Sequence, residues 1–129
     1  MTLETRKSVD ALLALPAKPD LLIRWMQSRG ESGAPPFRIL YDTLMAHAAT
    51  DPGEALRATE HVLTALGPRL VANGSSFLRH LQANTLLLVG RAADSLPSYR
   101  LAFDAFRRAR DPREAGRVTI GWAFALAIT

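Results

Sequence analysis

Apolar residues recur every three or four positions through almost the whole chain, which is the spacing of one face of an α-helix. The clearest run follows Pro36 and consists of Phe37, Leu40, Tyr41, Leu44, Met45 and Ala48. No segment alternates apolar and polar residues as a half-buried strand does, and Asn73-Gly74 is flanked by helical patterns. The pattern therefore predicts an all-α fold.

Glycine, proline and capping residues divide this pattern into about seven helices in antiparallel hairpins. The predicted organisation of the single domain 1–129 is an N-terminal helix pair over 1–29, a loop over 30–36, two helical hairpins over 37–72 and 75–112, and an unpaired C-terminal helix over 112–129. The first helix is expected from about Leu3 to Leu15, and the second from near Asp20.

Several helix ends are marked by particular residues. Asp51-Pro52-Gly53-Glu54 and Asp111-Pro112-Arg113-Glu114 combine a capping aspartate, a proline suited to the first position and a glutamate that favours the positive end of the helix dipole. Gly67-Pro68 should interrupt the helix that starts at Asp51. Ser75 or Ser76 is expected to cap the next helix, and the one after it should start at Ser95 to Pro97.

Composition agrees with this fold and excludes some chemistry. Hydrophobic residues make up 48% and aromatic residues 7% of the 129 positions, so alanine and leucine, which are strong helix formers, carry the apolar content. Because there is no cysteine, disulfides and thiolate sites are excluded, and the chain fits a reducing cytoplasm. No window approaches the roughly 20 apolar residues of a membrane span.

Charge is distributed unevenly along the chain. Residues 1–66 hold seven basic and eight acidic side chains, whereas residues 67–129 hold nine arginines and four acids. The densest cluster consists of Arg107, Arg108, Arg110, Arg113 and Arg117. Such a cluster is either a solvated surface, a docking site for an acidic peptide or part of a nucleic-acid-binding surface, although no recognised nucleic-acid motif accompanies it.

The hairpin over 75–112 resembles a tetratricopeptide repeat in the spacing of its small and large residues. The residues that carry the resemblance are Leu86, Val89, Gly90, Ala93, Ala102, Phe106, Ala109 and Pro112. The preceding hairpin repeats the pattern with a constant offset of 44 residues, which joins Ala58 to Ala102 and Pro68 to Pro112. That family's period is about 34 residues, and an insertion over 67–76 matches the difference. The alternative to a repeat array is an irregular helical bundle.

The resemblance implies an adaptor that binds a protein partner in a groove lined by the first helix of each unit. Carried over, it implicates Leu40, Thr43 and His47 from one hairpin and Asn84, Leu87 and Arg91 from the next. Asn84 and Arg91 are seven positions apart and are expected to share one helical face, where they either hold a peptide carboxylate together or remain solvated. The arginine-rich helix pair leading into 113–118 also resembles repeat regions of larger bacterial regulators and signalling proteins.

The most apolar stretch is the last helix, over Val118–Ile128. A helix that is apolar all round must be covered on all sides, whereas repeat arrays normally end in a polar-faced cap. We therefore expect this helix to lack its partner within the chain, so that the chain is the N-terminal part of a longer protein or another chain covers the helix. Val118, Trp122 and Phe124 join the expected partner-binding residues.

Candidate catalytic and metal-binding residues are few. His47 and His61, with Glu60 nearby, are candidate metal ligands, but their spacing matches no metal motif, and no nucleophile, phosphate or dinucleotide motif is present. We expect no catalytic residues, no metal and no cofactor. The predicted function is protein binding. The alternatives are a helical nucleic-acid-binding domain that uses the basic half and, third, a small helical enzyme.

Overall fold

The computed structural model describes residues 3–15, 18–29, 36–73 and 75–129, and the predicted loop over 30–36 lies almost wholly outside them. These described residues form seven helices and no strand, which confirms the all-α prediction. The helices are α1 (Leu3–Ala14), α2 (Pro19–Arg29), α3 (Pro36–Ala48), α4 (Pro52–Asn73), α5 (Ser75–Leu88), α6 (Ala92–Arg108) and α7 (Pro112–Ile128).

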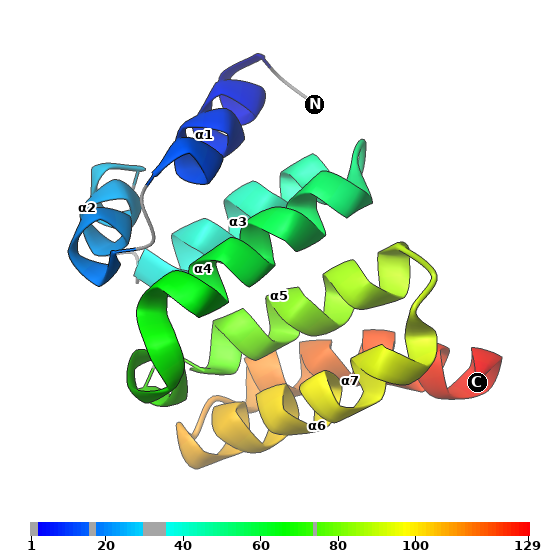
Figure 1. Cartoon of the computed structure of the whole chain (residues 1–129). Helices are drawn as coiled ribbons and strands as arrows, with labels where there is room; N and C mark the ends of the chain where they lie inside the picture. Colours follow the sequence, from blue (N-terminus) through cyan, green and yellow to red (C-terminus); the bar gives the residue numbers. More distant parts are fainter. Residues whose placement is uncertain (1–2, 16–17, 30–35, 74) are drawn as a thin grey trace.

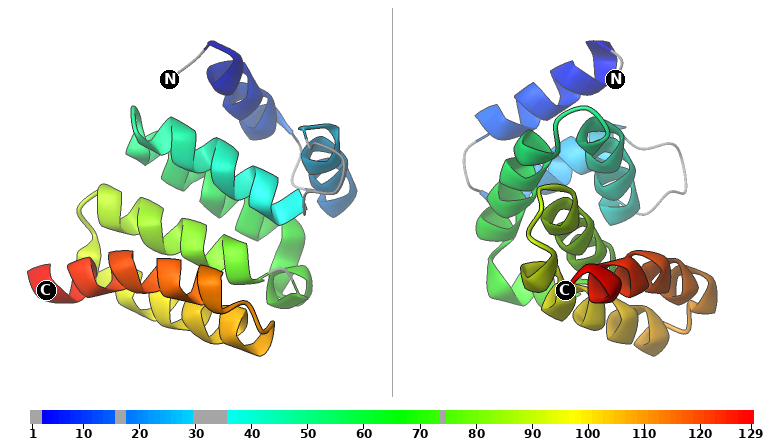
Figure 2. Two further views of the ribbon diagram at one scale, coloured as in Figure 1. Left: turned by 180° about the vertical axis from the view of Figure 1, so that it is seen from behind. Right: turned by 90° about the vertical axis from the view of Figure 1, so that its right-hand side faces the viewer.

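From α3 onward the helices are stacked as successive antiparallel elements in two layers. Helices α3, α5 and α7 follow one another in one layer, and α4 and α6 lie in the other (Figures 1 and 2). Helices α1 and α2 lie at one end of this stack and pack against α3 and α4. The stack brings α3, α5 and α7 to one face, which we call the inner face.

Two clusters of buried residues hold the stack together. The first joins α1 to α4 with the start of α5, and its fully buried members include Leu12, Leu22, Met26, Leu40 and Leu44. The second joins α5, α6 and α7 and consists of Ala83, Tyr99, Ala102, Phe106, Ala115, Val118 and Ala125. Phe77 on α5 packs against both clusters. Burial of this apolar surface is the main force that stabilises the helices, since their intrinsic propensities alone are weak.

The two predicted aspartate caps are confirmed. Asp51 Oδ1 accepts the backbone N–H of Glu54 at 3.0 Å, and Asp111 Oδ1 accepts that of Glu114 at 3.2 Å. The bond from Glu54 also lowers the pKa of the Asp51 carboxyl, because the donated N–H stabilises the carboxylate. The predicted interruption at Gly67 is confirmed as well: this residue has φ 74° and ψ 166°, with helix on both sides.

One helix start was predicted wrongly. Helix α5 begins at Ser75, close to the start predicted from Ser75 or Ser76. Helix α6 begins at Ala92 and not at Ser95 to Pro97, so Pro97 lies within the helix. Ser95 is buried, and its hydroxyl donates to the carbonyl of Ala92 at 2.6 Å, so it does not cap the helix from outside.

Helices α5 and α6 end in the same motif, in which one residue takes a left-handed conformation. Gly90 has φ 87° and Arg110 has φ 57°. In each case the N–H of that residue and the N–H of the next residue donate to carbonyls of the last helical turns. The N–H of Gly90 donates to the carbonyl of Leu87, and the N–H of Arg110 donates to the carbonyl of Arg107. Gly90 and Arg110 therefore lie just beyond the ends of α5 and α6 and not within them.

This shared motif gives a matched pair of stability predictions. Gly90→Ala should lower the free energy of unfolding by about 1 kcal/mol, and Arg110→Gly should raise it by up to about 1 kcal/mol, because only glycine adopts positive φ without steric cost. Chemical denaturation of both variants checks this. Changes of the same sign in the two variants would contradict the assignment.

Candidate functional site

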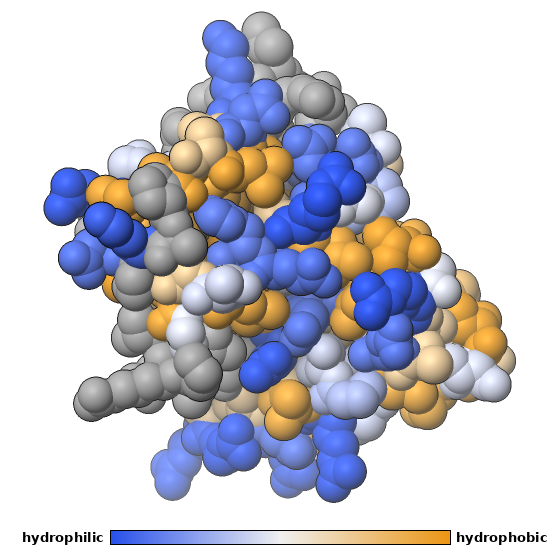
Figure 3. Space-filling model, in the orientation of Figure 1, coloured by the Kyte–Doolittle hydropathy of each residue, from blue (hydrophilic) through white to orange (hydrophobic). Residues whose placement is uncertain are grey.

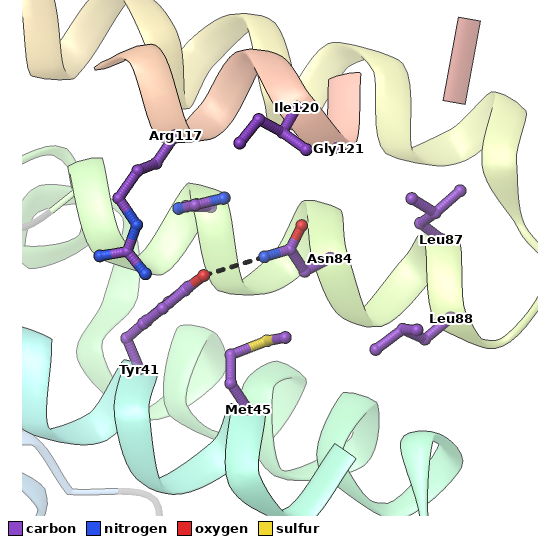
Figure 4. A pocket seen from close by; sticks show the side chains of 9 residues that line it. Tyr41, Met45, Asn84, Leu87, Leu88, Arg117, Ile120 and Gly121 are labelled. Atoms are coloured by element: carbon purple, nitrogen blue, oxygen red, sulfur yellow. Dashed lines mark hydrogen bonds between the residues drawn. The ribbon is translucent and has the colours of Figure 1, made fainter. Parts of the chain in front are cut away.

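A cleft of about 320 Å³ opens on the inner face between α3, α5 and α7, and we call it the inner cleft. Figure 4 shows its side chains, which come from all three helices. They are Tyr41 and Met45 from α3, His80, Asn84, Leu87 and Leu88 from α5, and Arg117, Ile120 and Gly121 from α7. Apolar side chains form most of its wall, and a few polar groups meet at its floor.

The floor of the inner cleft is built on a hydrogen-bonded chain. The buried Tyr99 hydroxyl donates to Asn84 Oδ1 at 2.6 Å, and Asn84 Nδ2 donates to the Tyr41 hydroxyl oxygen at 3.0 Å. Because Tyr41 accepts this bond, its own hydroxyl hydrogen is available to donate. Burial raises the pKa of both tyrosines, so both hydroxyls remain protonated at neutral pH.

Gly121 makes this arrangement possible. A Cβ at this position would lie 2.5 Å from the hydroxyl oxygen of Tyr99, far inside normal contact distance. Glycine therefore lets Tyr99, which comes from α6, reach the backbone of α7 and bond with Asn84 on α5. Close packing thus requires glycine at position 121, whereas nothing lies within 4 Å of a Cβ built at Gly116.

Arg117 supplies the positive charge of the inner cleft. Its guanidinium reaches down from α7 toward Tyr41 (Figure 4). One of its nitrogens, Nη1, lies 3.1 Å from Glu114 Oε1 and 3.5 Å from Oε2. A guanidinium has donors on three nitrogens, so the others remain available to a bound group.

His80 is the least satisfied group beside the cleft. It is buried, it stacks on Tyr41 with ring centroids 4.9 Å apart, and its Nδ1 has no hydrogen-bond partner. Burial, with a smaller contribution from the charge of Arg117, lowers its pKa to about 4. His80 is therefore neutral at physiological pH.

The structure brings only part of the predicted binding residues to the inner cleft. Asn84 and Leu87 line it, and Phe124 is exposed one helical turn after Ile120. Thr43 is partly buried and is not part of the lining. Trp122 packs on the side of α7 that faces α6, where its ring lies 5.7 Å from that of Phe103.

Several predicted residues lie away from the surface proposed for them. The prediction that Asn84 and Arg91 share a helical face is wrong, because α5 ends at Leu88 and Arg91 pairs instead with Asp94 at 2.9 Å. Leu40, His47 and Val118 are fully buried, so they do not present a surface to a partner. Periodicity alone placed them on a helix but did not show which helix would cover them.

His47 belongs to a different group, at the junction between α3 and α4. Its Nε2 lies 3.2 Å from Glu54 Oε2, and the ligand atoms of His47, Asp51 and Glu54 lie within 4.8 Å of one another. Asp51 already caps α4, and Glu54 contacts the buried histidine, so the three side chains hold the turn between the helices. We assign this group a structural role.

Two residues of the inner cleft, Tyr41 and Arg117, were not singled out as neighbours by the sequence. Tyr41 belongs to the apolar stripe of its helix, and Arg117 belongs to the arginine cluster. Their approach depends on the packing of α3 against α5 and of α5 against α7, which periodicity within one helix does not reveal.

No helix among the described residues is long and apolar enough to cross a membrane. Comparisons with protein-family models, curated proteins and solved structures found no match.

Proposed function

We propose that this chain is a protein-interaction module that binds a segment of another protein along its inner face. The observation that carries the proposal is a row of exposed apolar side chains on α7. Ile120 is 74% exposed and Phe124 is 58% exposed, and Ile128 continues the row. Exposed apolar side chains gathered in one place mark interaction surfaces more often than isolated ones do.

The row extends the inner cleft. Residues four apart lie on the same side of a helix, so Ile120, Phe124 and Ile128 point in similar directions. Ile120 itself lines the inner cleft, together with Leu87 and Leu88 from α5. The proposed contact surface therefore runs from the cleft toward the C-terminal end of α7.

The polar floor suits a segment that brings hydrogen-bond acceptors. The Tyr41 hydroxyl and the remaining nitrogens of Arg117 are donors, and a peptide carbonyl or a carboxylate accepts such bonds. Apolar walls around a few polar groups are typical of binding sites. The side chains that line the inner cleft include no serine, cysteine or carboxylate, which supports a role in binding over one in catalysis. We further propose a tetratricopeptide-like array and a cytoplasmic location.

Site-specific cross-linking tests the proposal. A photoreactive amino acid at Phe124 should capture a protein partner in an extract of the native cells, whereas the same group at Thr64, exposed on α4 in the other layer, should not. The purified partner is then titrated against Phe124→Asp. Replacement of a central apolar contact residue by a charged one costs about 2 kcal/mol of binding free energy, so we expect the affinity to fall roughly thirtyfold.

Two results would contradict the proposal. One is cross-linking at Phe124 that yields no protein adduct or only a second copy of this chain. The other is an unchanged affinity of the captured partner for Phe124→Asp. Phe124 is exposed, so its replacement should leave the fold intact, and the far-ultraviolet circular dichroism of the variant checks this.

A further inference from the structure

A second groove, of about 630 Å³, lies between α6 and α7 on a different side of α7, and we call it the outer groove. Its lining residues are Leu96, Pro97, Arg100, Leu101, Asp104 and Trp122. Trp122 is two positions from both Ile120 and Phe124, and two positions correspond to about 200° around a helix. The outer groove is therefore separate from the proposed surface on the inner face.

The outer groove is an apolar seam between two antiparallel helices. On α6, Pro97, Leu101 and Asp104 are spaced three or four apart and share one face, and Leu101 is 47% exposed. On α7, Trp122 forms the facing wall and the exposed Leu126 follows it by one turn. Figure 3 shows apolar residues gathered at the side of the molecule where α7 ends.

The chain itself indicates which kind of element fits such a seam. Helix α5 packs against both α3 and α4, and α7 packs against both α5 and α6. In each case a helix lies along a seam between two antiparallel helices. A helix with an apolar stripe would cover Leu101 and Trp122 in the same way.

The charged side chains beside the outer groove indicate the chemistry of the helix that would bind there. Arg100 lines the outer groove, and Arg107 and Arg108 line a hollow beside it with Asp104. Within the part of the chain that the structure describes, none of these three arginines has an ion pair, and Asp104 is the only carboxylate lining either site. By contrast, Arg91 and Arg117 are paired with acids of their own helices.

We infer that the outer groove binds an amphipathic helix of another protein, with acidic side chains beside its apolar stripe. The apolar stripe would cover Leu101 and Trp122, and the acidic side chains would lie against Arg100, Arg107 and Arg108. A second copy of this chain in the same groove would bring the arginines of two molecules together, which like-charge repulsion disfavours.

Binding of two matched peptides to the full chain tests this inference. Both are fluorescent helical peptides roughly five turns long with a leucine stripe, and they differ only in flanking residues, which are glutamate in one and lysine in the other. We expect the acidic peptide to bind about tenfold more tightly, a difference that two or three partly exposed ion pairs supply. Added salt should reduce this preference.

Matched variants locate the peptide. Leu101→Asp should weaken binding of the acidic peptide about tenfold, because it places a negative charge in the apolar seam. Leu88→Asp, at a similarly exposed leucine in the inner cleft, should leave the affinity unchanged. Arg100→Glu should remove most of the preference for the acidic peptide.

Three results would overturn the inference: equal binding or no binding of the two peptides, loss of binding in Leu88→Asp instead of Leu101→Asp, or a dimer in light scattering that Leu101→Asp dissociates. The last would assign the outer groove to a second copy. The cross-linking experiment at Phe124 is a separate measurement on the inner face, so failure of this inference can be distinguished from failure of the proposed function.

Discussion

Acidification from pH 6.5 to pH 4 should lower the free energy of unfolding by about 3 kcal/mol through His80 alone. The pKa of this histidine is lowered to about 4 in the folded chain, chiefly by burial, whereas the unfolded chain has the ordinary value of 6.5. Between pH 6.5 and pH 4 the histidine is therefore protonated in the unfolded state but largely neutral in the folded state. The free energy of unfolding is at its full value above pH 6.5 and decreases as the pH falls toward 4.

His80→Phe isolates this effect from the other titrating groups. A phenylalanine ring retains the stacking on Tyr41 and the edge contact with Phe106 but cannot be protonated. At pH 7 the variant should be more stable by about 1 kcal/mol, because the unpartnered buried Nδ1 is gone. At pH 4.5 its advantage should grow by more than about 2 kcal/mol.

Urea unfolding of both proteins at the two pH values measures the difference. The two proteins differ only at position 80, so the comparison isolates the contribution of His80. If the two proteins lost stability in parallel on acidification, His80 would not be the group that titrates between pH 6.5 and pH 4.

Gly121→Ala should destabilise the fold by about 1–3 kcal/mol, although alanine is normally the better helix former. A methyl group there would meet the hydroxyl of Tyr99 at 2.5 Å and its ring carbons at 2.9 and 3.0 Å. Tyr99 is fully buried and is bonded to Asn84, so it has little room to move. The strain should also disturb the hydrogen-bonded floor of the inner cleft.

Gly116→Ala provides the matched control on the same helix. Gly116 is exposed, and nothing lies within 4 Å of a Cβ built there. That variant should therefore gain about 0.5–1 kcal/mol from the reduced backbone entropy of its unfolded state. Thermal or chemical unfolding of the two variants gives the sign of each change. Stabilisation by both substitutions would show that Tyr99 does not pack against Gly121.

The helix boundaries could be predicted where a short residue pattern is compatible with one local structure only. The aspartates at 51 and 111 each precede a proline, and that combination marks a helix start whatever the rest of the fold does. Gly90 was ambiguous, because a glycine serves equally as a small packing residue and as the left-handed end of a helix. Because Gly90 was taken as helical, Arg91 was predicted on the wrong surface. Pro97 was ambiguous too: proline is most common at the first helical position, so the start of α6 was predicted too late in the sequence.

The candidate site was harder to predict than the helices. Asn84 meets Tyr41 across 43 positions of sequence and Tyr99 across 15. Contacts of this kind depend on the order and angle of helix packing, about which the period of one helix carries no information. The sequence did identify α7 as the most apolar stretch, and Ile120 and Phe124 on this helix are exposed.

Among the described residues, α5 is the helix that contributes to both buried clusters, and this affects how the molecule opens. Helix α5 gives Leu78 and Leu81 to the first cluster and Ala83 to the second. Because α7 contributes only to the second cluster, its detachment leaves the first cluster packed. Amide protons in α7 are thus free to exchange with solvent through a partial opening, while those of α5 exchange only when both clusters come apart. The helix that carries the proposed contact surface can therefore open while the first cluster stays packed.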